Sequence, residues 1–104
     1  MRRGEIWWAD LARPVGGRPV VILTRNAVVN SIGAVAVAIV TRNIRHLPIE
    51  VALGRGQGLL VQCVANLDTI LTVPRERLVR QMGACDAAKI GELERAIKLA
   101  LDIP

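Results

Sequence analysis

Two polar residues border apolar segments in the N-terminal half of this 104-residue chain and could together bind a phosphodiester. Arg18 precedes the apolar residues 20–23, and Thr41 follows a second apolar run over residues 35–40. Both runs predict buried strands, so an arginine at the start of one strand could lie close to a threonine at the end of the other. A guanidinium pairs with two phosphate oxygens at once, and a hydroxyl adds a neutral donor.

The elements that must position these residues are predicted to be mainly short strands, because apolar runs alternate with Gly, Pro and Arg. Over residues 5–11, Trp7, Ala9 and Leu11 share one face, as in a half-buried strand. We expect Trp7 in the core and Trp8, on the other face, at a subunit interface. The other expected strands cover residues 18–24, 34–41, 48–53, 59–66, 69–73 and 79–84. Their connections are a turn at 13–17, a loop at 25–33, a polar connection at 42–47, a flexible loop at 54–58 and, after Pro74, a short helix at 75–78.

The last part of the chain changes to a helical period. Asp86 is a candidate N-cap, and apolar residues recur at positions 90, 93, 97 and 101. We expect one amphipathic helix that packs Ile90, Leu93, Ile97 and Leu101 against the sheet. The chain is therefore predicted to be a single domain over residues 1–104, mostly β with a C-terminal helix.

The charge of the chain points to a polyanionic partner. The formal net charge is +5, and 12 of the 14 basic residues are arginine. Residues 1–55 hold eight arginines and three acidic residues, whereas the rest of the chain is balanced. Nucleic acid is the first partner that such a basic half suggests, with a solvated basic surface as the alternative.

Several catalytic chemistries are excluded by the residues present. His46 is the only histidine, which rules out a ribonuclease that uses two histidines of one chain. Ser31 lacks the turn of a serine nucleophile, and the nine acidic residues are scattered singly, so we expect no metal site and no cofactor. Cys63 and Cys85 have neither the number nor the spacing of a disulfide framework or a zinc site, and Cys63 is predicted to be a small buried residue.

Nothing in the sequence indicates a leader or a membrane segment. Asp10 and Arg13 interrupt any signal-peptide core, and the longest uncharged stretch, residues 26–41, is too short to span a bilayer. With two unpaired cysteines, this predicts a soluble, cytoplasmic protein. RNA would be a suitable substrate, because its own 2′-hydroxyl can attack the adjacent phosphate while arginine and threonine stabilise the charge that develops.

Short motifs in a specific order resemble the MazF/PemK family of toxin endoribonucleases over nearly the whole chain. They are Arg3-Gly4-Glu5-Ile6-Trp7, Arg18-Pro19-Val20-Val21-Ile22, Val37-Ala38-Ile39-Val40-Thr41, Leu47-Pro48-Ile49-Glu50-Val51 and Gly58-Leu59.

The resemblance implies a small SH3-like β-barrel with a C-terminal helix, and a homodimer that an acidic antitoxin neutralises. It implies sequence-selective, metal-independent cleavage of single-stranded RNA, which leaves a 2′,3′-cyclic phosphate and a 5′-hydroxyl. The RNA class (mRNA, tRNA or rRNA) stays open. Arg18 and Thr41 match the catalytic residues of the family.

The chain also departs from the family pattern. The loop before Arg18 is short, Cys63 stands where serine is common, and residues 68–72 have Thr69 and Leu71 in place of the usual Gln and Arg. Candidate RNA-binding residues are Arg13, Arg25, Arg42, Arg45, His46, Asp68 and Thr69. For Arg42, Arg45 and His46, solvated loop charges are the alternative reading.

Two other functions fit the same fold. The gyrase-poisoning CcdB family shares it but binds a protein, so the fold alone does not decide the activity. A passive nucleic-acid-binding module is the second alternative. The match at Arg18 and Thr41 favours the nuclease.

Overall fold

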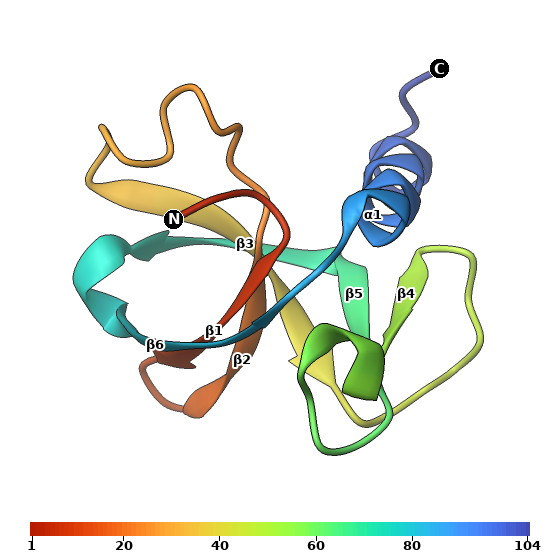
Figure 1. The fold of residues 1–104 in the computed structure, drawn as a ribbon, viewed down its shortest axis with the longest axis horizontal. Helices are drawn as coiled ribbons and strands as arrows, with labels where there is room; N and C mark the ends of the chain where they lie inside the picture. The colour runs from red at the N-terminus through yellow and green to blue at the C-terminus, as the bar shows by residue number, and fades with distance from the viewer.

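A computed structural model describes residues 1–104 and shows one antiparallel sheet with a single helix (Figure 1). Along the sheet the strand order is β4-β5-β3-β2-β1-β6. The strands are β1 (Glu5–Asp10), β2 (Gly17–Ile22), β3 (Ala34–Thr41), β4 (Glu50–Leu53), β5 (Cys63–Pro74) and β6 (Leu78–Ala84), and the helix is α1 (Ala87–Ala100).

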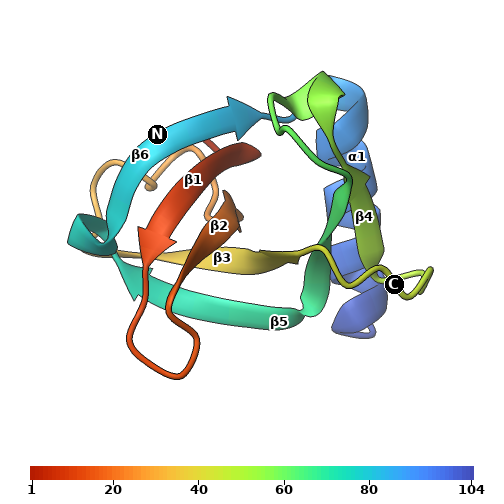
Figure 2. The same ribbon diagram turned by 90° about the horizontal axis from the view of Figure 1, so that it is seen from below.

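The predicted mostly β fold with a C-terminal helix is confirmed, but the sheet does not close into a barrel. It curls until β6 and β1 lie across from β3 and β5 (Figure 2). The edge strands β4 and β6 do not pair with each other. The helix α1 lies on the β4 side, and its Leu93 and Ala96 are buried among residues of β1, β4 and β5. Burial of the helix here replaces the strand pairing that would close a barrel.

Alternating side chains place two apolar clusters on the two faces of the sheet. The larger cluster contains Ile6 of β1, Val21 of β2 and the buried residues of α1. The smaller takes Val20 and Ile22 of β2, with half-buried Trp7 packed against it. Trp7 therefore belongs to the core, as predicted, and its Nε1 donates a 2.9 Å hydrogen bond to a Glu5 carboxylate oxygen.

The two strands predicted over 59–66 and 69–73 are one strand, β5, with an irregularity in the middle. Ala38 of β3 pairs with Ile70, whereas the next residue, Ile39, pairs with Asn66. Residues 67–69 therefore bulge out of the ladder, and the amide of Leu67 donates instead to the carbonyl oxygen of Ile49. The prediction of two separate strands is wrong, although the gap between them falls at the bulge. Residues 59–62 precede the strand and are not part of it.

Two of the predicted connections also differ from those in the structure. The loop at 54–58 contains a 3₁₀ turn, Arg55–Gln57, and the short helix after Pro74 is a 3₁₀ turn, Arg75–Arg77. Each is only three residues long, which is the usual length for this tighter helix.

The helix α1 begins where predicted, because the Asp86 carboxylate accepts a 2.9 Å hydrogen bond from the amide of Lys89. Ile90 and Ile97 pack partly against the larger cluster. The expectation for Leu101 is wrong: the helix ends at Ala100, and the Leu101 side chain is 56% exposed. No helix in the structure has the length and apolar character needed to cross a membrane.

Gly83 of β6 permits a close backbone contact that holds the segment at 54–62. A Cβ atom at this position would lie 1.8 Å from the carbonyl oxygen of Gln57, which is backbone and cannot swing away. We expect Gly83→Ala to lower the free energy of unfolding by about 1–3 kcal/mol, measured by urea denaturation. The matched control is Gly56→Ala, because a Cβ there meets no atom within 4 Å. Equal stability of the two variants would contradict this contact.

Candidate functional site

The pairing of β2 with β3 brings Arg18 and Thr41 together. Val20 pairs with Ile39 in this antiparallel ladder. Continuing the register by two residues sets Arg18 opposite Thr41, and both line one open cavity of about 570 Å³. The structure thus unites the two residues that the sequence selected as a possible phosphodiester site.

The guanidinium of Arg18 has no anionic partner. The structure contains two salt bridges, Arg3–Glu94 and Lys89–Glu92, and neither involves Arg18. Arg18 is half-buried as a whole. Its Nε atom is fully buried and has no hydrogen-bond acceptor. An anion that enters the cavity could accept a hydrogen bond from this Nε and pair with the charge. The cavity is therefore suited to a phosphate, which could accept from the guanidinium.

Thr41 is oriented by its own backbone. Its Oγ1 accepts a 3.1 Å hydrogen bond from the amide of Asn43. A hydroxyl can accept and donate at once, so its proton stays free to donate into the cavity. Arg42, the next residue, is exposed and lines the same cavity. One phosphate could thus meet a guanidinium and a hydroxyl together, with a second positive charge at the rim.

The remaining wall of this cavity is largely apolar, and this wall was not predicted from the sequence. Trp8 of β1 lies here beside Arg18. The expectation that Trp8 packs at a subunit interface stays a prediction. The alternation of β1 does place Trp8 on the opposite face from Trp7, and this was the available signal. The other lining residues are Gly17, Pro19, Val40, Asn43, Leu59, Leu60, Val61, Cys63 and Met82.

Four of the candidate RNA-binding residues lie apart from this cavity. Arg13 is exposed in the connection between β1 and β2, and Arg25 is exposed in the loop after β2. Asp68 and Thr69 are exposed in the bulge of β5. None of these four lines the cavity of Arg18 and Thr41.

The connection at 42–47 carries Arg45 and His46 and is held by one carboxylate. Glu50 Oε1 accepts from the amides of Arg45 at 3.0 Å and Leu47 at 3.3 Å. His46 has a φ of 58°, a left-handed conformation that the two hydrogen bonds help to hold. Glu50 therefore fixes the segment that follows Thr41.

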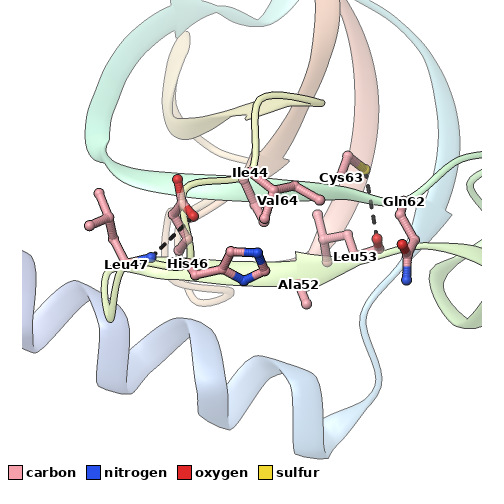
Figure 3. A pocket seen from close by; sticks show the side chains of 9 residues that line it. Ile44, His46, Leu47, Ala52, Leu53, Gln62, Cys63 and Val64 are labelled. Atoms are coloured by element: carbon pink, nitrogen blue, oxygen red, sulfur yellow. Dashed lines mark hydrogen bonds between the residues drawn. The ribbon is translucent and has the colours of Figure 1, made fainter.

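His46 lines a smaller cavity of about 220 Å³ beside the first (Figure 3). Figure 3 shows its imidazole near Ala52, and Gln62 and Cys63 also line this space. Cys63 borders both cavities, so they adjoin each other. Arg45 is exposed and lines neither of them.

The two cysteines are buried thiols, as expected for Cys63. The thiol of Cys63 donates to the carbonyl oxygen of Leu53 at 3.8 Å, and burial raises its pKa. Burial raises the pKa of Cys85 to about 11, an effect that Lys89 partly offsets. A raised pKa leaves little thiolate at neutral pH, so Cys63 is a poor nucleophile despite its place at the cavity. No group of three or more His, Cys, Asp or Glu side chains in the structure could hold a metal ion.

Cys63→Ser should therefore leave any turnover that takes place in the cavity of Arg18 and Thr41 within about twofold of the wild-type value. The serine hydroxyl can donate to the same carbonyl oxygen of Leu53, and no thiolate chemistry is lost. Turnover measured side by side at neutral pH checks this. A large loss of turnover in a variant that remains folded by circular dichroism would show that the thiol takes part.

Fold and cavity together describe a small β protein with an unpaired arginine and a threonine in one cavity. The model of the PemK-like, MazF-like toxin of type II toxin-antitoxin systems matches residues 2–101. The chain is 42% identical over 93 residues to the probable endoribonuclease MazF2 of Mycobacterium tuberculosis, covering 88% of this chain and 89% of that protein. It is 37% identical over 115 residues to endoribonuclease MazF9 of the same species, covering 99% and 98%.

Solved structures agree with the sequence relatives. The Mycobacterium tuberculosis toxin MazF-mt6 superposes with a TM-score of 0.89 at 35% identity, covering 96% of this chain and 98% of that one. An endoribonuclease from a mycobacterial species, in complex with its cognate antitoxin, also gives 0.89, at 28% identity and 100% and 97% coverage. The chain belongs to the PemK/MazF-like family of toxins of type II toxin-antitoxin systems, which confirms the resemblance seen in its motifs.

Proposed function

We propose that this toxin is an endoribonuclease that cleaves single-stranded RNA in the cavity of Arg18 and Thr41. The observation that carries the proposal is the unneutralised Arg18 guanidinium opposite a threonine hydroxyl in one cavity. The relatives that cover most of the chain are named endoribonucleases, which supports the same activity.

The chemistry follows from the groups that face the phosphate. The 2′-oxygen of the substrate attacks phosphorus as its proton leaves, and the bond from phosphorus to the 5′-oxygen breaks as that oxygen gains a proton. The products are a 2′,3′-cyclic phosphate and a 5′-hydroxyl. Negative charge grows on the non-bridging oxygens during the attack, where Arg18 and Thr41 can donate to them. These two residues are thus the catalytic pair.

Arg42 is the residue best situated to hold the neighbouring phosphate, because it follows Thr41 and lines the same cavity. His46 lies in the adjoining cavity, and Arg45 lies on the same connection between β3 and β4. Both residues would contact the RNA further along its backbone. Arg13, Arg25, Asp68 and Thr69 would contact RNA only beyond these cavities, or in a second subunit of a homodimer.

The basic N-terminal half also explains how the toxin would be restrained. An acidic antitoxin is electrostatically complementary to the eight arginines before residue 56, which favours fast and specific capture. The similar endoribonuclease from a mycobacterial species was solved in complex with its cognate antitoxin. We propose the same arrangement for this chain, with action on RNA in the cytoplasm.

Arg18→Ala should lower the cleavage rate about 10²–10³-fold, because one charged donor to the transition state is lost. Purified protein and RNA, analysed by gel, give the rate. The matched control is Arg95→Ala, an exposed arginine on α1 away from the cavity, which should cleave normally. If Arg18→Ala cleaves at the wild-type rate, the catalytic assignment is wrong. RNA that is bound but never cut by the wild-type protein would favour a passive binding module.

An RNA with a single 2′-deoxy sugar before the cut phosphate should resist cleavage at that position, because the nucleophile is missing. The same RNA with all ribose sugars should still be cut in excess EDTA, since Arg18 supplies the positive charge. Mapping of the 5′ ends by sequencing reads out both results. Cutting at the deoxy position, or activity that EDTA abolishes, would contradict attack by the 2′-hydroxyl without a divalent ion.

A further inference from the structure

Trp8 is a large aromatic residue without a place in the hydrophobic core. Neither apolar cluster contains it, and it is not among the half-buried residues packed against them, although its neighbour Trp7 is. Burial of a tryptophan side chain is a major source of stability. Trp8 is only half-buried, so part of its indole surface stays accessible in the cavity. The accessible part of the Trp8 ring can therefore contact a ligand.

The backbone of β2 supports the indole ring from below. A Cβ atom on Gly17 would lie 2.7 Å from Cζ2 of Trp8 and 3.2 Å from Cε2, so any larger residue at position 17 would push the ring away. Gly17 also borders the cavity, next to Arg18. The Trp8 Nε1 forms no hydrogen bond within the chain, whereas the Nε1 of Trp7 is held by Glu5. The ring thus packs against the Gly17 backbone, with its Nε1 not used by the fold.

The surroundings of Trp8 determine what can bind to it. Arg18 and Thr41 line the cavity on one side and suit a phosphate, while Leu59 and Met82 contribute apolar surface. A nucleotide has this same division, since a charged phosphate is joined to a flat aromatic base. Stacking of a base on an aromatic side chain favours binding and tolerates any base, because every base has a π face.

We propose that Trp8 is the stacking surface for a nucleobase next to the cleaved phosphate. This proposal rests on the proposed function, because it takes the phosphate to be bound by Arg18 and Thr41. Trp8 is a substrate-binding residue in this reading. It holds the base so that the adjoining phosphate stays beside Arg18, which supports cleavage by orientation.

Fluorescence gives a direct test, because Trp7 and Trp8 are the only aromatic residues of the chain. The probe is an oligoribonucleotide that carries the mapped cleavage site, with one 2′-deoxy sugar to prevent cutting. Titration into the Trp7→Phe variant, whose emission comes from Trp8 alone, should quench that emission. Titration into Trp8→Phe, which retains only Trp7, should leave the emission nearly unchanged.

A second measurement separates stacking from general damage. Removing the base next to the cleaved phosphate, by an abasic substitution, should weaken binding to the wild type about tenfold. The same removal should have little effect on Trp8→Leu, which has no ring to lose. Trp8→Phe should recover most of the sensitivity to the abasic change, because it restores an aromatic face.

The outcomes are distinct. If wild-type protein cleaves the all-ribose RNA but the abasic change weakens wild type and Trp8→Leu equally, the Trp8 proposal is overturned while the proposed function stands. If no RNA is cleaved, the proposed function fails and this proposal fails with it. If Trp8→Leu dissociates a wild-type dimer in size-exclusion chromatography and the abasic effect is absent, Trp8 is a subunit contact and the proposal is overturned.

Discussion

The antiparallel register between β2 and β3 is the constraint on which the site depends. It sets the N-terminal end of one strand against the C-terminal end of the other, which brings Arg18 opposite Thr41. A slip of one residue between the two strands would leave Arg18 and Thr41 on opposite faces of the sheet. The register is secured by apolar pairs such as Val20 with Ile39 and Val21 with Ala38, all of them buried. Core packing and site geometry are thus set by the same residues.

The two apolar clusters of the fold hold no charged side chain, and Arg18 lies outside both of them. The residues with the lowest exposure form two clusters, one on each face of the sheet, and no charged or polar residue is fully buried among them. The helix α1 adds Leu93 and Ala96 to the larger cluster and covers the side that the sheet leaves open. The unpaired Arg18 guanidinium therefore lies near the start of β2, outside the apolar clusters, where an anionic ligand could reach it.

The sequence predicted the strand pattern, the helix with its Asp86 cap, and the pairing of Arg18 with Thr41, because each depends on local periodicity or on a short motif. It did not predict the parts that depend on long-range packing. The union of 59–66 and 69–73 into β5 follows from pairing with β3, which no local signal encodes. The exposure of Leu101 follows from the end of the helix at Ala100.

Among the site residues, the distinction between near and distant arginines came only from the fold. Arg42 lines the cavity, while Arg13 and Arg25 lie on other loops, although all three are similar in the sequence. The place of Trp8 depends on the absence of a side chain at Gly17, a contact between two strands that composition cannot reveal.

The bulge at residues 67–69 changes the phase of alternation along β5. Before it, Cys63 and Ala65 face the larger cluster, and Leu67, the first residue of the bulge, is buried there too. After it, Ile70 packs on that cluster, while Leu71 and Val73 face the smaller one. Three extra residues, an odd number, exchange the two faces of the strand. A related chain could lose or gain two residues in the bulge and keep both apolar clusters. A change of one residue would exchange the faces of the side chains that follow the bulge in β5. The length of this short segment is therefore restricted to odd numbers, whatever residues occupy it.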